Sequence, residues 1–265
     1  MATPESRPSP PAFDQYVKWL AGKCTSTEIA SAESRLRTVG ATLAADVESS
    51  SLWQQLLGSL RNIEDEYTSF SDFRLFVTQE TPEIVQKPYE SVLEKSFRKN
   101  ILLNKHWPEP PDGGWITPAN WFERTNDIIR TMMIVKYLDG VEFLVNRIRE
   151  IADEHSSKFS VDYEASDEGY YAAHCYPVFE LDVPKLDWDT EKQAIRLEIQ
   201  VTTQLQDVIR KLTHKYYEQR RAQEIPSRKW QWNYASPEFV PNYLGHILHY
   251  VEGMIMDVRM RGRTE

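Results

Sequence analysis

Two carboxylates stand at positions where acidic side chains are uncommon. Asp127 opens a nearly continuous apolar run, Asp127 to Leu138, of the kind that forms a buried strand. Glu198 lies within Ile195 to Val201, where apolar and polar residues alternate as in a strand with one polar face. Carboxylates on neighbouring strands can hold magnesium, which takes one or two of them together with water and nucleotide phosphates. An exposed edge strand is the alternative explanation for Glu198.

A basic helical face is the second feature that could do chemistry. Lys87, Ser91 and Lys95 are spaced four residues apart within Thr81 to Asn100, so they stack on one face of the short helix that this stretch predicts. Ammonium groups on such a face can neutralise phosphate charge. A solvated basic face explains the same pattern without any ligand. The sequence contains no glycine-rich P-loop, which argues against a Walker-type nucleotide site.

The remaining metal-binding residue types indicate structural roles. His246, His249 and Glu252 lie three apart on the predicted final helix, but the HExxH order of a zinc site is absent. We therefore expect these histidines to form hydrogen bonds in the core. Cys24 and Cys175 have neither CxxC nor histidine-linked spacing, so we expect no disulfide and no structural zinc.

Composition limits the class of protein. A chain of 265 residues with 41% hydrophobic content can bury a substantial core, and one α/β domain with helical extensions fits that length. No apolar run is long enough to cross a bilayer and no apolar leader opens the chain, so we expect a soluble, cytoplasmic protein without a membrane partner. The net charge of -9 argues against salt-driven binding of nucleic acid.

The elements that must position these residues follow from periodicity. We expect a disordered leader at 1–12, a helical section at 13–80, an α/β core at 81–221 and a helical extension at 222–265. The proline- and glycine-rich stretch Asn104 to Asn120 predicts a long loop. The predicted elements are helices Phe13–Leu20, Thr27–Ala45 and Ser51–Tyr67, a turn at Asp139–Gly140, helix Val141–Ala152, strands Phe159–Tyr163 and Ala172–Val183, and helices from Gln204 and over Pro237–Met260.

Both C-terminal helices carry an apolar stripe. The helix from Gln204 has Leu205, Val208, Ile209, Leu212 and Tyr216. For the final helix we expect a buried stripe of Tyr243, Leu244, Ile247, Leu248, Val251, Ile255 and Val258.

Four segments, in this order, resemble the motifs of the RelA/SpoT synthetase family, in its small stand-alone form. They are KPYESVLEK from Lys87, NDIIRTMMIVKYLDGV around Asp127, GYYAAH from Gly169, and LEIQVTT around Glu198 followed by THKYYEQ. The resemblance implies a nucleotidyltransferase-like mixed β-sheet flanked by helices, an α/β (α+β) fold, with helical N- and C-terminal extensions. It further implies an alarmone-making pyrophosphokinase that moves the β,γ-pyrophosphate of ATP to the 3′-hydroxyl of a guanosine nucleotide, usually GDP or GTP.

The resemblance also assigns roles by motif position. Asp127 and Glu198 would be the catalytic pair that holds Mg²⁺, and Glu198 would help to deprotonate the acceptor hydroxyl. The residues that would meet the ATP phosphates are Lys87, Ser91, Lys95 and Arg130. Tyr170 would stack on the acceptor base, and the pocket would be lined or supported by His174, Gln200, His214 and Lys215. Without the motif, Tyr170 and His174 are explained by rim packing and by a hydrogen-bonded strand histidine.

The chain departs from the family pattern at four positions that are basic in the family: Val85, Met132, Ser166 and Thr202. Arg130, two residues from Met132 on a strand, points the same way and can compensate for one loss. Three functions therefore stay open. They are a guanosine alarmone synthetase, a toxin-like member that modifies the tRNA 3′ end or makes adenosine alarmones, and a catalytically weak nucleotide-binding or interaction module. The helical extensions leave room for a homo-oligomer.

Overall fold

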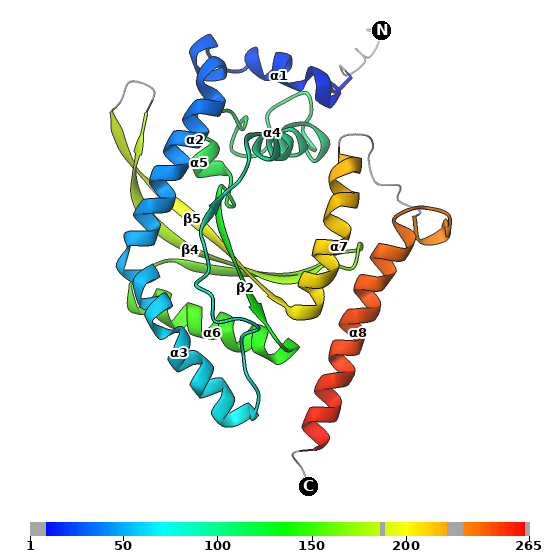
Figure 1. The fold of residues 1–265 in the computed structure, drawn as a ribbon. Helices are drawn as coiled ribbons and strands as arrows, with labels where there is room; N and C mark the ends of the chain where they lie inside the picture. The colour runs from blue at the N-terminus through cyan, green and yellow to red at the C-terminus, as the bar shows by residue number, and fades with distance from the viewer. Residues whose placement is uncertain (1–8, 186–188, 222–229, 263–265) are drawn as a thin grey trace. The chain divides into compact units, whose positions relative to one another are not determined.

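The computed structural model describes residues 9–185, 189–221 and 230–262, with side chains for these except 213–221 (Figure 1). The chain forms two compact units that interleave in sequence. The first unit comprises Met1–Ser49, Ile84–Arg130 and Val178–Leu197, and the second comprises Ser50–Glu83, Thr131–Pro177 and Glu198–Glu265.

A mixed five-stranded sheet has the order β1-β2-β5-β4-β3. Its strands are β1 (Val85–Gln86), β2 (Ile129–Val135), β3 (Phe159–Ala165), β4 (Tyr171–Pro184) and β5 (Thr190–Thr203). β1 pairs antiparallel with β2, and β3 pairs antiparallel with β4. β5, which carries Glu198, is therefore an interior strand, and Glu198 is buried with 4% of its surface exposed. The exposed-edge explanation for Glu198 is wrong.

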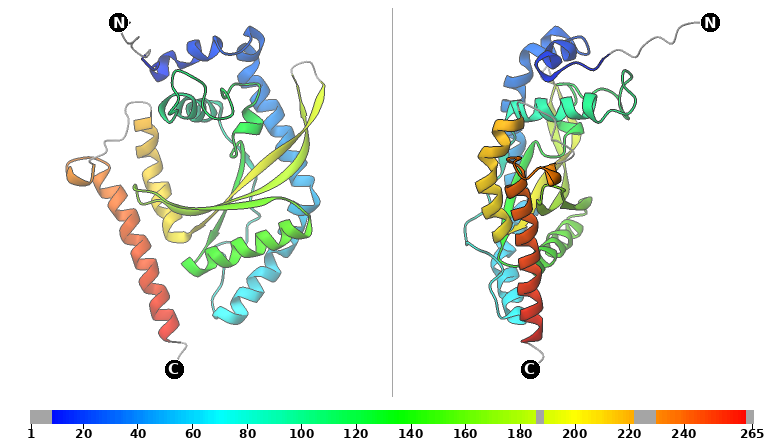
Figure 2. Two further views of the ribbon diagram at one scale, coloured as in Figure 1. Left: turned by 180° about the vertical axis from the view of Figure 1, so that it is seen from behind. Right: turned by 90° about the vertical axis from the view of Figure 1, so that its right-hand side faces the viewer.

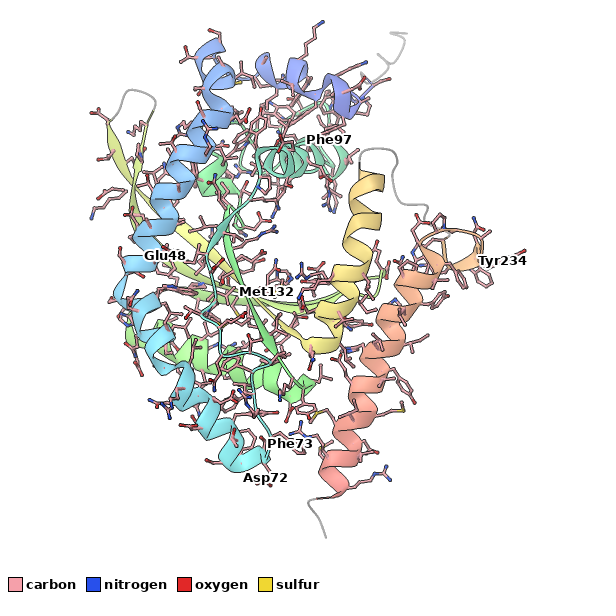
Figure 3. All side chains as sticks on the ribbon, in the orientation of Figure 1. Glu48, Asp72, Phe73, Phe97, Met132 and Tyr234 are labelled. Carbon is pink, nitrogen blue, oxygen red and sulfur yellow. The ribbon has the colours of Figure 1, made fainter. Side chains whose placement is uncertain are left out.

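The first unit contains α1 (Phe13–Ala21), α2 (Ser26–Ser49), α4 (Tyr89–Phe97), the π-helical turn η1 (Arg98–Leu102) and α5 (Trp121–Arg124). Tyr16 packs edge-on against Phe97, which Figure 3 labels, and donates a hydrogen bond to Ser96. The predicted loop is present between η1 and α5. Asn100 fixes it, because its amide donates to the carbonyl of Ile116 over 2.8 Å and accepts from the amide nitrogen of Ile116 over 3.0 Å.

The second unit contains α3 (Ser51–Ser71), α6 (Leu138–Glu154), α7 (Gln204–Arg221), the 3₁₀ turn η2 (Trp230–Trp232) and α8 (Phe239–Arg261). α3 packs against α6, and α7 lies beside α8, as the two views of Figure 2 also show. The predicted turn at Asp139–Gly140 is wrong, because both residues belong to the first turn of α6. No helix among the described residues is both long and apolar enough to span a membrane.

The last helix lies where the sequence predicts it, but the predicted buried face is wrong. Tyr243, Leu244, Ile247, Ile255 and Val258 are exposed. The residues of α8 that are buried are instead small or polar: Asn242, Gly245 and Glu252. On α7 likewise, Val208 and Leu212 are exposed, whereas Gln206, Asp207 and Ile209 are buried.

Candidate active site

A buried carboxylate in the first unit is held between two lysines. Asp127 lies two residues before the start of β2, and Lys87 directly follows β1. The amide of Lys87 donates to the carbonyl of Ile128 over 2.8 Å, which places the lysine beside the aspartate. Lys87 Nζ lies 2.5 Å from Asp127 Oδ2, and Lys95 Nζ, from α4, lies 2.7 Å from Asp127 Oδ1. Side chains predicted as separate candidates thus form one cluster.

The charges of this cluster are unevenly matched. Burial raises the pKa of Asp127, but the charges and hydrogen bonds of Lys87 and Lys95 outweigh it and hold that pKa below its ordinary value. Burial lowers the pKa of Lys87, and the charges of Lys95 and Arg130 lower it further against the attraction of Asp127. Both pKa values are lowered, which favours the charged form of Asp127 but disfavours that of Lys87, because Lys87 is buried and shares one carboxylate with other cations. The cluster is therefore ionised at its aspartate and has an excess of positive charge.

Arg130 and Lys99 enlarge the positive charge. Arg130 lies on β2 on the less buried face that Met132 shares, as the alternating burial of this strand shows. Lys99 was not among the predicted site residues. Its Nζ donates to the carbonyl of Arg124 over 3.2 Å, and burial followed by the charge of Lys95 lowers its pKa. Its position four residues after Lys95 was the available signal, since residues four apart stack on a helix.

Ser91 lies on α4 four residues before Lys95, half-buried, as the spacing predicts. The π-helical turn η1 follows this helix directly. Such turns are frequent at functional sites.

The second carboxylate accepts three hydrogen bonds within the second unit. His174 Nδ1 lies 3.0 Å from Glu198 Oε1, and the hydroxyl of Tyr176 donates to the same oxygen over 3.1 Å. The side-chain amide of Gln200 donates to Glu198 Oε2 over 2.7 Å. An ionised carboxylate only accepts hydrogen bonds, so this donor set matches the anion. Tyr176 was missed by sequence reasoning, although it lies two residues from His174 on β4 and therefore on the same face.

His174 is the cation of this second cluster. Burial lowers its pKa, but the hydrogen bonds to Glu164 and Glu198 outweigh burial and raise the pKa to about 9. At neutral pH the ring is therefore protonated, and it donates from Nε2 to Glu164 Oε2 over 3.1 Å. Glu164 was also missed; the β3–β4 register, which pairs Asp162 with His174, brings it close.

Tyr170 lies at the turn that joins β3 to β4. Gly169 has a φ of +80°, and the turn closes through a hydrogen bond from the amide of Tyr170 to the hydroxyl of Ser166. The hydroxyl of Thr202 donates to the carbonyl of Tyr171 over 3.0 Å. The Tyr170 ring is half-buried, and its centroid lies 6.0 Å from that of His174. Two positions that are basic in the family motif, Ser166 and Thr202, thus brace this turn as neutral hydroxyls.

The C-terminal helix α8 contacts the turn between β3 and β4 and the first residue of β4. The Tyr171 hydroxyl lies 2.8 Å from His246 Nδ1, and its ring stacks on His249 with centroids 3.7 Å apart. Gly169 and Gly245 touch so closely that a Cβ on Gly245 would lie 2.3 Å from the carbonyl oxygen of Gly169. His246 forms the expected hydrogen bond, but the expected position in the core is wrong, because His246 and His249 are both half-buried. Their contacts with Tyr171 explain why α8 docks here.

Two predicted acceptor residues, His214 and Lys215, lie outside the described side chains. Among the side chains that are described, no three His, Cys, Asp or Glu residues gather in a metal-binding group. The two carboxylates, Asp127 and Glu198, are nevertheless chemically suited to Mg²⁺, because that ion takes hard oxygen ligands and needs only one or two from the protein. Asp127 is ionised, as such a ligand must be.

No family model matches the chain, and no curated protein matches it. Solved structures do. The small alarmone synthetase 1 from Bacillus subtilis aligns over 80% of this chain and 92% of its own, with 15% identity and a TM-score of 0.50. A GTP pyrophosphokinase family protein from Streptococcus pneumoniae aligns over 78% and 89%, with 18% identity and a TM-score of 0.49. The predicted fold class is confirmed: this chain has the fold of the Bacillus subtilis small alarmone synthetase.

Proposed function

We propose that this protein is a magnesium-dependent pyrophosphokinase that transfers the β,γ-pyrophosphate of ATP to the 3′-hydroxyl of a guanosine nucleotide. The observation that carries the proposal is the buried, ionised Asp127 held between Lys87 and Lys95 in a chain with this fold. A buried carboxylate with two lysines is costly to maintain, because each charge loses its hydration. Binding of a polyphosphate would explain why the chain keeps these buried charges despite that cost.

On the donor side the lysines would exchange partners. Asp127 forms ion pairs with both Lys87 and Lys95. The triphosphate of ATP would take over the two ammonium groups, with Arg130 and Lys99 adding positive charge and Ser91 a hydroxyl. Asp127 would then be free to serve as a carboxylate ligand of Mg²⁺, the role that the motif resemblance also gives to Glu198. When bound, that ion would neutralise the charge that develops on the phosphates.

On the acceptor side Glu198 is already aligned by three donors. Tyr170 would stack on the acceptor base, and Glu198 would take the proton of the 3′-hydroxyl. The 3′-oxygen forms a bond to the β-phosphorus while the bond from that phosphorus to the α,β-bridging oxygen breaks. AMP leaves with that oxygen, and the acceptor carries the pyrophosphate. His174, protonated at neutral pH, would hold Glu198 in place during the transfer.

The test is AMP release from labelled ATP with magnesium and GDP or GTP. Asp127→Asn and Glu198→Gln should each lower the rate at least ~100-fold, since both remove a charge needed in the transition state. Glu180→Gln, at an exposed position of β4, is the matched control and should leave the rate unchanged. The proposal fails if no acceptor yields AMP, or if the two site variants retain the rate of the control.

A second candidate acceptor is favoured by one observation. Positive charge is kept at the donor cluster, in Lys87, Lys95 and Arg130, but it is lost beside Tyr170, where Ser166 and Thr202 are neutral and bonded to the turn. The 3′-terminal nucleotide of tRNA carries one phosphodiester charge, fewer than GDP or GTP, and would suit that surface better. We therefore keep the 3′ end of tRNA as the alternative. An adenosine nucleotide, whose phosphates equal those of its guanosine counterpart, stays as an acceptor only on the departures from the motif.

The same assay separates these acceptors when GDP, GTP, ADP, ATP and bulk tRNA are compared. Activity with tRNA that falls steeply as salt rises would select tRNA, because phosphate contacts release counterions. A catalytically weak binding module would release no AMP but would still bind Mg-ATP. Its unfolding free energy would rise by about 2.7 kcal/mol at 100 times the dissociation constant.

A further inference from the structure

The inner face of α8 buries a carboxylate, Glu252, midway along the helix, with 4% of its surface exposed. Neither of its oxygens accepts a hydrogen bond from a described residue. His249 Nδ1 lies 3.5 Å from Glu252 Oε2, but burial followed by the charge of His246 lowers the pKa of His249, so its ring is neutral at pH 7. Glu252 is therefore buried without a counter-charge in the described part of the chain.

Such a carboxylate is costly to keep in the interior of a protein. Burial raises the pKa of Glu252, and the neutral side chains of Thr203 and Gln206 act against burial without offsetting it. If packing alone decided this position, an apolar side chain of similar volume would stabilise the fold better. The reason for the carboxylate must therefore lie in the space that it lines.

That space is a cavity of about 160 Å³ within the second unit. Its other walls come from the junction of β2 with α6, from the start of α7 and from α8, and they are formed by Lys136, Tyr137, Leu138, Gln204, Leu205 and Ile255. Of these, Gln204 and Ile255 are exposed, so the cavity opens to solvent between α7 and α8.

The lining carries one charge of each sign on an apolar background. Lys136, which directly follows β2, makes no ion pair with any residue that the structure describes. An anion would meet the charge of Glu252, and a simple cation would meet that of Lys136. An uncharged molecule would leave both charges unpaired, which is costly when they lose their hydration. A zwitterion with an aliphatic body matches both charges and the apolar walls.

The volume limits the size of this ligand. Pockets for drug-sized ligands begin at about 300 Å³, so a nucleotide is too large. A cavity of about 150 Å³ holds benzene, which has six non-hydrogen atoms. The ligand therefore has on the order of six to nine non-hydrogen atoms, which is the size of valine or leucine.

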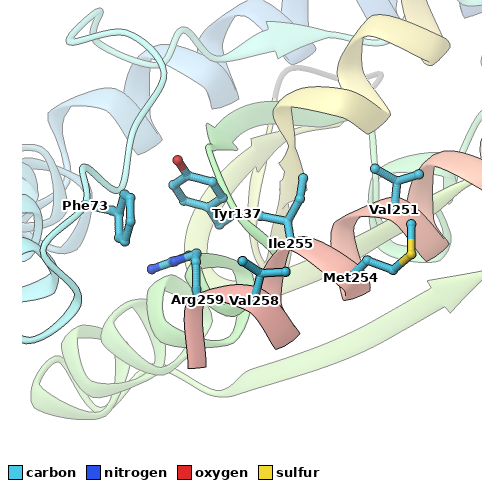
Figure 4. Close-up of a pocket in the computed structure, with 7 residues that line it drawn as sticks. All are labelled: Phe73, Tyr137, Val251, Met254, Ile255, Val258 and Arg259. Carbon is cyan, nitrogen blue, oxygen red and sulfur yellow. The ribbon is translucent and has the colours of Figure 1, made fainter. Parts of the chain in front are cut away.

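A wider groove of about 340 Å³ adjoins the cavity and shares Tyr137 and Ile255 with it (Figure 4). The charged residue of this groove is Arg259. Its Nη1 lies 3.1 Å from Asp139 Oδ1, so its charge is already matched. The two unmatched charges belong to the smaller cavity, which is where a zwitterion fits.

We propose that this cavity binds a free aliphatic α-amino acid, whose ammonium group pairs with Glu252 and whose carboxylate pairs with Lys136. The side chain of the ligand then lies against Leu138 and Leu205. Charge-assisted hydrogen bonds at both ends of the ligand supply the counter-charges that the described residues lack. The bound amino acid contacts α7 and α8 together and stabilises their packing.

Isothermal titration calorimetry of the full chain with L-valine and L-leucine tests the site. We expect saturable binding of one molecule per chain. Isopentylamine and isocaproate keep the aliphatic body of leucine but each lacks one of its charges, so each should bind at least ~10-fold more weakly.

Variants assign the site to the cavity. Glu252→Gln and Lys136→Met each remove one charge at nearly constant size, and each should weaken leucine binding at least ~10-fold. Asp257→Asn removes the same charge as Glu252→Gln from the same helix, but at an exposed position outside the cavity, and should leave the affinity unchanged.

Three results of these titrations would overturn the proposal. If neither amino acid binds at millimolar concentration, the cavity holds only water. If isopentylamine binds as tightly as leucine, Glu252 is a site for simple cations. If Glu252→Gln and Asp257→Asn have the same affinity, the amino acid binds elsewhere.

Melting curves separate loss of binding from loss of folding. Ligand-free Glu252→Gln should melt no lower than the wild type, because a neutral amide costs less to bury than an unpaired carboxylate. Leucine should raise the melting temperature of the wild type but not that of Glu252→Gln. A ligand-free Glu252→Gln that melts well below the wild type would show that the fold itself uses the carboxylate, and would overturn the proposal.

Discussion

The charge state of His174 makes a quantitative prediction about stability. Its pKa rises from the ordinary 6.5 to about 9, and each pKa unit corresponds to 1.36 kcal/mol. The shift of this buried ring is worth roughly 3 kcal/mol at most. One of its two partners, Glu164, is 48% exposed, so solvent screens that half of the interaction and about 2 kcal/mol remains at pH 7.

The sign follows from linkage. A group whose pKa is raised in the folded state stabilises that state fully below its unfolded pKa, here about 6.5. The contribution disappears as the pH rises through about 9. Between pH 7 and pH 9.5 the wild type should therefore lose about 2 kcal/mol of unfolding free energy that a variant without the imidazole does not lose.

Urea denaturation at several pH values, for the wild type and for His174→Gln, measures that difference. Other groups titrate in both proteins, so their contributions cancel in the comparison. Parallel curves would refute the reasoning. An NMR titration of the histidine rings of the wild type gives a second readout that needs no variant, and a His174 resonance that titrates near 6.5 would refute it as well.

Three further outcomes are expected. Lys99→Ala should raise KM for ATP ~10-fold, since it removes one charged phosphate contact, whereas Lys105→Ala, at an exposed position, should not. Equal KM values would remove Lys99 from the site. Gly245→Ala should lower the melting temperature, because its Cβ would lie 2.3 Å from the Gly169 carbonyl oxygen, whereas Gly253→Ala has open space and should stabilise by about 0.5–1 kcal/mol. Tyr171→Phe should destabilise by about 1 kcal/mol through loss of the bond to His246, and an unchanged melt would contradict this.

Local pattern predicted much of the candidate site because spacing fixes faces. The four-residue step from Ser91 to Lys95 and the alternation around Glu198 placed these side chains on their elements correctly. The prediction that Lys87 shares that helical face is wrong, because Lys87 directly follows β1 and α4 begins only at Tyr89. Residue spacing along one strand does not predict which residue of a neighbouring strand a side chain contacts. The contacts of Glu198 with His174 and Tyr176 depend on which strand lies beside β5, and the role of Glu164 depends on the β3–β4 register. Both are set by the packing of the whole sheet.

The error on α8 has a different origin. The apolar period of Leu244, Ile247 and Val251 correctly predicts a helix with one hydrophobic face. Period alone does not say whether that face is covered by the same chain. Here the fold requires a close approach at Gly245, and only a glycine allows α8 to come so near Gly169. That requirement turns the small and polar residues inward and the aliphatic ones outward.

The fastening of α8 to the Gly169 turn ties two distant properties together thermodynamically. The turn presents Tyr170, and α8 holds it through Gly245 and the ring of His249. Any ligand whose affinity depends on the position of α8 must then change the affinity for whatever binds Tyr170. Linkage makes that effect reciprocal, so the acceptor would change the affinity at α8 by the same factor. Binding to the C-terminal helix, outside the site, would thus alter the affinity for a ligand at Tyr170.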